Sequence, residues 1–163
     1  MAGQPFTGYP QFSSPHALAA AALEAGFDVL ATANNHSCDR GNVGLLRTIS
    51  VLDSLGIART GTFADSSDLQ KNHPLILEKN NITLALLNYT YGTNGLPFYP
   101  PAVVNMIDTA TIKADLQNID KQKTDFTIIY FHWGNEYQSS PSKQQTDLAE
   151  WCFRQGVDVI IGS

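Results

Sequence analysis

The sequence predicts an α/β fold built on a mostly parallel sheet that is buried on both faces. Two observations support this prediction. The apolar segments 27–32, 125–131 and 157–161 are continuous rather than alternating, which is typical of strands covered on both sides. Amphipathic segments stand between them, as expected where helices connect parallel strands. We therefore predict a single α/β domain over residues 1–163.

The first elements follow from local signals. After an irregular lead-in, Ser14 offers an N-cap oxygen and Pro15 suits the first position of a helix. Gly26 suits a left-handed C-cap, and the strand 27–32 follows it directly. A second helix is predicted by apolar residues at helical spacing, and it ends at Gly56.

The second half continues with strands and helices. Two apolar runs flank the connection 79–81, which predicts a hairpin. An amphipathic segment then precedes the strand 125–131. Ser142 and Gln145 have the spacing of a capping box, so a helix is expected to begin there and to lead into the last strand. Because that strand, 157–161, lies at the end of the chain, we expect a partial domain.

Composition narrows the classes of function. The chain has no apolar run near the roughly 20 residues of a membrane-spanning helix, and no targeting segment, so it is expected to be soluble. Its 10 basic and 15 acidic residues give a formal net charge of −5, which argues against nucleic acid as a partner. The two cysteines cannot build a disulfide framework, and Cys38 is expected to be a small filler rather than a metal ligand.

Polar residues follow two of the predicted strands. Asn34-Asn35-His36 comes after the first strand, and His132 comes directly after 125–131. Ligands bind beyond the carboxyl ends of such strands, where imidazole and amide or carboxylate oxygens suit Mn, Fe, Zn or Mg. The spacing leaves two interpretations open, a metal site or histidines that serve only turns and core. His16 and His73 are expected at the surface.

Several motifs resemble the capsule-synthesis CapA family, also called the poly-γ-glutamate synthesis protein family. The resemblance covers about residues 12–163. It rests on Phe12-Ser13-Ser14-Pro15, Ala25-Gly26-Phe27-Asp28-Val29-Leu30, Ala33-Asn34-Asn35-His36, Asp39-x-Gly41, His132-Trp133-Gly134-x-Glu136-Tyr137 and Ile160-Ile161-Gly162-Ser163. This family is related to the calcineurin-like metallophosphoesterases, which implies a four-layer αββα sandwich.

The resemblance also implies roles for single residues. By similarity to the Gly-Asn-His of that superfamily, Asn35 would be a metal ligand and His36 the general acid that protonates the leaving group. His132 would be a second metal ligand. Asp39, Glu136 and Tyr137 belong to the family's own pattern, and we place them in the pocket as substrate-binding candidates.

Tyr91 is a further substrate-binding candidate, on different grounds. It lies in an aromatic stretch rich in Gly and Pro, 89–101, that follows a predicted strand. Such a loop could form a wall of the binding site at the same edge of the sheet. The alternative is that its aromatic residues only hold a long loop in place.

Three hypotheses of function remain. The resemblance implies a metal-dependent hydrolase or transferase with two divalent ions, acting on poly-γ-glutamate or polysaccharide with partner proteins at the cell envelope. The family's Gly-Asp and Asn-Leu-Glu segments and its His-Pro-His are not in this sequence, so part of the metal site is expected to be missing. The second hypothesis is therefore a non-catalytic assembly or binding component, and the third is a metal-free small-molecule binding domain that uses Tyr91. Whether the chain is an enzyme stays open.

Overall fold

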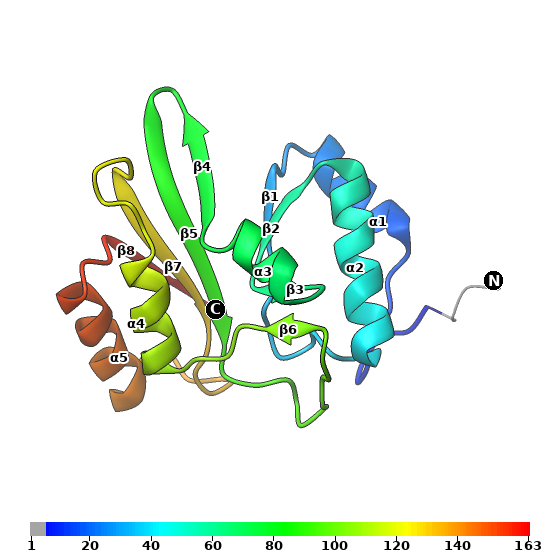
Figure 1. The fold of residues 1–163 in the computed structure, drawn as a ribbon. Coiled ribbons are helices and arrows are strands. Elements are labelled where there is room, and N and C mark those ends of the chain that lie inside the picture. Colours follow the sequence, from blue (N-terminus) through cyan, green and yellow to red (C-terminus); the bar gives the residue numbers. More distant parts are fainter. Residues whose placement is uncertain (1–5) are drawn as a thin grey trace.

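The computed structural model describes residues 6–163, which form four layers (Figure 1). Helices α4 (Thr109–Gln117) and α5 (Lys143–Arg154) cover one face of a four-stranded sheet. A two-stranded sheet lies on the other side, and α1 (His16–Glu24) and α2 (Gly41–Leu55) form the outer layer beyond it. The order helix, sheet, sheet, helix confirms the α/β prediction.

The larger sheet has the strand order β4-β5-β7-β8. Its strands are β4 (Leu75–Lys79), β5 (Ile82–Thr90), β7 (Phe126–His132) and β8 (Val159–Gly162). β4 and β5 form the predicted hairpin, whose turn residues Asn80 and Asn81 have φ angles of 54° and 62°, as a two-residue turn requires. β5, β7 and β8 run parallel, so their carboxyl ends meet at one edge.

The main core lies between this sheet and the helices α4 and α5. Leu87 and Ile129 of the sheet are fully buried there, together with Ile112 of α4 and Cys152 of α5. On β7, buried residues alternate with half-buried ones. The expected burial on both faces is therefore only partly met, because the second half of the sandwich within residues 6–163 has only two short sheets of two strands each.

Short strands complete the second half of the sandwich. β1 (Val29–Ala31) pairs in parallel with β2 (Ala58–Thr60), and β3 (Thr62–Phe63) pairs antiparallel with β6 (Val103–Val104). The remaining helix is α3 (Ser66–Asn72). Arg59 on β2 is buried and bonds Asp53 of α2 at 2.8 Å and Asp68 of α3 at 2.9 Å. These ion pairs around the buried Arg59 join both helices to the strand.

The helix ends follow most of the predicted caps. Ser142 and Gln145 form the expected capping box at the start of α5, and Gly56, with a φ of 70°, ends α2. The prediction that Ser14 caps α1 is wrong. Pro15 is itself the N-cap, because its backbone is extended with a ψ of 155°, and the helix begins one residue later at His16.

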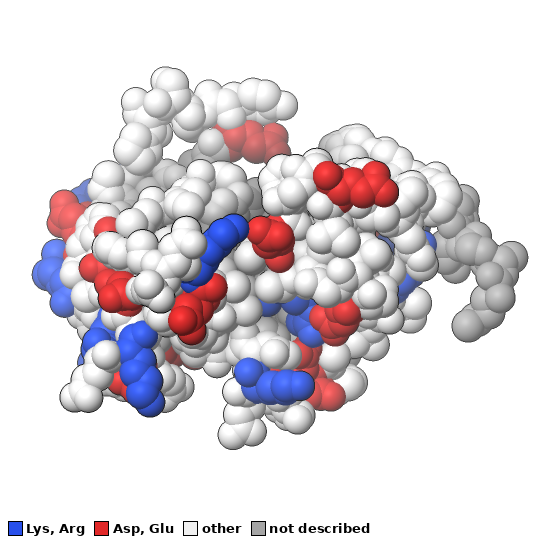
Figure 2. All heavy atoms as spheres, turned by 90° about the horizontal axis from the view of Figure 1, so that it is seen from above, with Lys and Arg blue, Asp and Glu red and all other residues white. Residues whose placement is uncertain are grey.

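The surface shows no single dominant charge on the face in view. Acidic and basic side chains are interspersed over that face rather than gathered in one patch (Figure 2). Among the helices of residues 6–163, none combines the length and the apolar character needed to cross a bilayer.

Candidate active site

Asn35 and His132 are separated by 97 residues in sequence and meet beyond the carboxyl ends of β1 and β7. His132 Nε2 lies 3.1 Å from Asn35 Oδ1. The other ring nitrogen, Nδ1, lies 2.9 Å from Ser163 Oγ, which directly follows β8. Ser163 thus sets the orientation of the imidazole, as outer hydrogen bonds do for metal-binding histidines.

The turn after β1 explains why Asn35, rather than Asn34, faces His132. Asn34 Oδ1 accepts the backbone N–H of His36 at 2.8 Å, and the N–H of Asn34 donates to Ser37 Oγ at 2.9 Å. These two hydrogen bonds of Asn34 help to close a tight turn. The side chains of Asn35 and His36 are left to face the adjoining cavity, which both of them line.

The donor atoms of this pair fit a divalent ion. Two ligand atoms about 2.1 Å from one ion and at a right angle to each other are about 3.0 Å apart, close to the observed separation. Burial, and to a smaller extent the charge of His36, lowers the pKa of His132. The ring is therefore neutral at pH 7, the form in which imidazole binds metals. Within residues 6–163, however, no group of three or more His, Cys, Asp or Glu side chains converges on one point.

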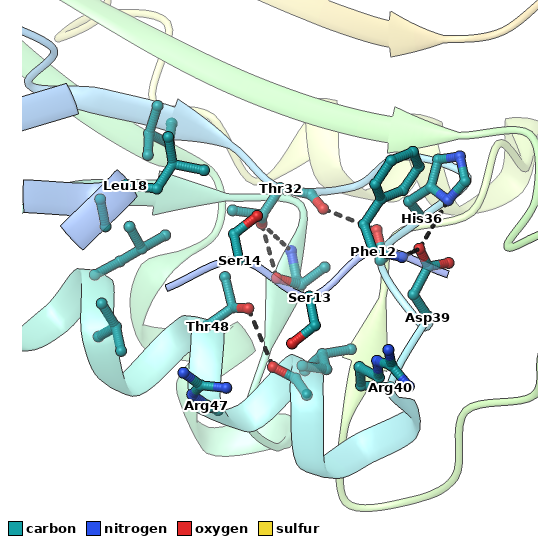
Figure 3. A pocket seen from close by; sticks show the side chains of 18 of the residues that line it. Phe12, Ser13, Ser14, Leu18, Thr32, His36, Asp39, Arg40, Arg47 and Thr48 are labelled. Atoms are coloured by element: carbon teal, nitrogen blue, oxygen red, sulfur yellow. Dashed lines mark hydrogen bonds and ion pairs between the residues drawn. The ribbon is translucent and has the colours of Figure 1, made fainter. Parts of the chain in front are cut away.

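His36 is held by Asp39, as Figure 3 shows. Asp39 Oδ2 lies 2.9 Å from His36 Nδ1 and accepts the backbone N–H of Phe12 at 2.7 Å. The Phe12 ring contacts the His36 ring edge-on, with centroids 4.7 Å apart. Asp39 is thus packed behind His36, with its side chain 4% exposed, and fixes which ring nitrogen stays free. Its predicted role in substrate binding stays a prediction.

Two hollows meet at His36 and Asp39. The larger, about 800 Å³, lies between α1, α2 and β1 and has a mainly apolar lining that includes Leu18 and Val51 (Figure 3). The smaller, about 310 Å³, is the one that Asn35 lines beside His132. It is lined by Tyr9, Pro10, Gln11, Asn35, His36, Asp39, Asn94, Leu96 and Glu136. The smaller cavity is therefore the place where a substrate could reach both Asn35 and His36.

The other three candidate residues are placed differently from one another. Glu136 lines the smaller cavity. The Tyr91 ring stacks on the His132 ring, with centroids 5.9 Å apart and planes 25° apart. Tyr137 is 98% exposed and does not line either hollow. The structure thus brings Glu136 and Tyr91 to the site and leaves Tyr137 outside it in this conformation.

The sequence reasoning missed two side chains of the site. Ser163 could have been predicted, because this residue directly follows β8, which ends at the same edge as β7. Asn94 accepts a hydrogen bond from Asn35 Nδ2 at 3.3 Å from within the loop 91–101. Nothing in the spacing of that loop distinguishes Asn94 from its neighbours.

Two other expectations concern Cys38 and His73. Cys38 is 1% exposed and packs in a core cluster, and burial, followed by the nearby Asp39 charge, raises the pKa of its thiol. It is a core filler, as expected. The surface position expected for His73 is wrong. Its side chain is 4% exposed, because it lies between the rings of Phe63 and Tyr89 with Nε2 3.0 Å from Asp115 Oδ2.

Comparison with known proteins places this arrangement in a family. The model of the family described as bacterial capsule synthesis protein PGA_cap matches residues 1–163. The chain is 29% identical over 151 residues to the PGA biosynthesis protein CapA of Bacillus subtilis (strain 168), which covers 85% of this chain and 37% of that protein. It is 28% identical over 152 residues to the capsule biosynthesis protein CapA of Bacillus anthracis. That match covers 87% of this chain and 35% of that protein. The chain thus spans about a third of the length of these curated relatives.

A solved structure shows the same fold. The NAD nucleotidase (NadN) of Haemophilus influenzae is similar with a TM-score of 0.57 and 21% identity, over 91% of this chain and 25% of that one. At this identity the likeness concerns the fold alone, and it confirms a metallophosphoesterase-like α/β fold of which the chain covers a part. On the family match over its whole length, the chain belongs to the PGA_cap family of bacterial capsule synthesis proteins.

Proposed function

We propose that this chain forms part of a divalent-metal-dependent hydrolase or transferase in the synthesis of capsule, poly-γ-glutamate or a related surface polymer. One observation carries the proposal. Asn35 and His132 come from different strands, yet their oxygen and nitrogen lie 3.1 Å apart beside a cavity that His36 also lines. A neutral imidazole and an amide oxygen at that separation are suited to a shared ion.

In this proposal the residues divide into binding and proton transfer. A divalent ion bound by Asn35 and His132 would lower the pKa of a water molecule and polarise a phosphoryl or carbonyl group. His36 keeps Nε2 free, since Asp39 occupies Nδ1, and gives a proton from Nε2 to the leaving atom. Glu136 and Tyr91 would contact the substrate from the rim.

The substrate and the place of action come from the family. Capsule and PGA synthesis in the relatives' names supports a polymer substrate, partner proteins of polymer synthesis, and action at the cell envelope. Two protein ligands do not hold two ions. The proposed dinuclear site therefore requires further ligands from outside the described residues, and Mn, Fe, Zn or Mg would each suit the pair of donors.

A second candidate function is a non-catalytic binding or assembly component with the same fold. The small number of candidate ligands within residues 6–163 favours it, because catalytic metal sites usually have at least three protein ligands. Such a protein would use the same cavity to hold a polymer segment without breaking a bond.

The experiment that separates the two uses the full-length protein. Its metal content is measured after purification, and hydrolysis of a chromogenic phosphodiester and of a γ-glutamyl amide is followed with and without a chelator. We expect bound metal and chelator-sensitive turnover, both lost in Asn35→Ala and kept in Asn72→Ala, a control whose amide bonds Asp68 in α3. A metal-free protein that binds the polymer without turnover would support the assembly role.

A further inference from the structure

A fully buried asparagine lies behind the candidate site. Asn88 is the residue of β5 paired with Tyr130 of β7, and its side chain has no exposed surface. Asn88 Oδ1 accepts the backbone N–H of Ala33 at 2.7 Å. Asn88 Nδ2 donates to the carbonyl oxygens of Ala33 and Tyr130, both at 3.2 Å. One side chain therefore joins two backbone segments that are remote in sequence.

These two segments lead to Asn35 and His132, the two proposed metal ligands. Ala33 lies two residues before Asn35, and Tyr130 lies two residues before His132. The separation of the two ligands is thus set over a short path through Asn88, with two residues of backbone on each side. Because every polar atom of this buried amide has a partner, the link is strongly specified.

The backbone at Gly61 packs directly against the Asn88 side chain. Gly61 lies against it with a φ of 105°, and a Cβ atom at that position would come within 2.1 Å of Asn88 Oδ1 and 2.6 Å of Ala33 N. A side chain at residue 61 is therefore excluded by contact as well as by backbone conformation. The segment after β1, the turn after β2 and the carboxyl-terminal part of β5 meet at this junction.

We propose that Asn88 is a positioning residue that sets the distance between Asn35 and His132. Its role in metal binding rests on the proposed function, whereas its role in the geometry of the pair does not. If Asn88 is replaced by an apolar residue, the Ala33 N–H loses its partner, and the carbonyls of Ala33 and Tyr130 lose a donor. The loop after β1 can then shift relative to β7, and a shift of even 1 Å separates the two ligand atoms.

The first test reads the geometry without metal. Asn88→Leu keeps the branching at Cγ and removes all three hydrogen bonds. The control Thr127→Val changes another fully buried polar residue of the same sheet, at the opposite end of β7, where it bonds Lys121. We expect Asn88→Leu to shift the ring ¹⁵N signals of His132 and to abolish the nuclear Overhauser contacts between His132 and Asn35, and Thr127→Val to preserve both at a comparable loss of melting temperature.

The second test measures Mn²⁺ affinity in the full-length protein. We expect Asn88→Leu to weaken it by about 10- to 100-fold, the range seen for residues that orient metal ligands, and Thr127→Val to leave it within about twofold. Unchanged His132 signals in Asn88→Leu would overturn the inference, as would an unchanged affinity. A wild-type protein that binds no Mn²⁺ would count against the proposed function, while the ¹⁵N signals would still decide on Asn88. If Asn88→Leu does not fold, the smaller Asn88→Ser replaces it in both tests, with the same direction of effect expected.

Discussion

His132 and His73 each lie about 3 Å from an oxygen of another side chain, yet their surroundings give them different parts to play. His132 stands at the open carboxyl end of β7, next to Asn35 and a cavity that Asn35 lines. His73 is enclosed between two aromatic rings, and its partner Asp115 also accepts the hydroxyl of Tyr89 at 2.7 Å. A polar partner alone therefore does not distinguish the two histidines. The metal-binding role is proposed only for His132, because it lies at a strand end beside Asn35, which lines a cavity.

The largest effect expected is on metal affinity. In the full-length protein, His132→Ala removes one of the two donors and is expected to weaken Mn²⁺ binding by more than about a hundredfold. His73→Leu removes an equally polar ring far from that pair and is expected to change the affinity by less than about twofold. Titration of the free ion by electron paramagnetic resonance measures both. Equal effects of the two substitutions on Mn²⁺ affinity would contradict the proposed difference between His132 and His73.

The next largest effect is on turnover. His36→Ala is expected to lower kcat by about 10²- to 10⁴-fold, the range for loss of a general acid, while Mn²⁺ affinity stays close to that of the wild type. His16→Ala is a suitable control, because His16 is exposed at the start of α1, where it accepts a hydrogen bond from Arg47. If kcat survives His36→Ala, His36 is not the proton donor.

Substitutions in the cluster of His73, Asp115 and Tyr89 should change the free energy of unfolding rather than the metal affinity. Tyr89→Phe leaves a largely buried Asp115 carboxylate without its hydroxyl donor, and we expect it to lower the free energy of unfolding by about 1–3 kcal/mol. Tyr99→Phe changes an exposed ring and should have almost no effect. Urea unfolding monitored by circular dichroism measures both. A loss of Mn²⁺ affinity in Tyr89→Phe would show that the two regions are coupled after all.

The smallest effect expected is a change in pH dependence. Burial lowers the pKa of His132 below its ordinary value of 6.5. Between that lowered pKa and 6.5, the unfolded chain binds more protons at this residue than the folded one, so His132 contributes to a fall in stability as the pH drops through the window. Unfolding free energies at pH 7.5 and 5.5 should therefore differ less in His132→Gln than in the wild type. An identical difference in both proteins would place the ring in solvent.

Much of the fold could be predicted because its signals are local. The hairpin at 79–81, the Ser142–Gln145 capping box and the glycine that ends α2 each depend on a few adjacent residues. His73 was misplaced because its burial depends on Asp115, Phe63 and Tyr89, three partners from other elements.

The candidate site was predictable to the extent that strand ends meet at one edge. Asn35 and His132 do meet, but the expected single edge is wrong, because β1 and β7 belong to different sheets that face each other. The family resemblance supplied their roles. The strand-end rule could not show that Asp39 lies behind His36, since that contact depends on how the turn after β1 closes. Asn88 gave no signal either, because an asparagine inside an apolar strand has no periodic or motif context that marks it.

The central claim is that Asn35 and His132 hold one divalent ion between them. Anomalous diffraction from crystals of the full-length protein grown with Mn²⁺ tests it most directly. We expect an anomalous peak about 2.0–2.3 Å from both Asn35 Oδ1 and His132 Nε2, absent from crystals of His132→Ala. Mn²⁺ bound elsewhere, with the Asn35–His132 hydrogen bond intact, would contradict it.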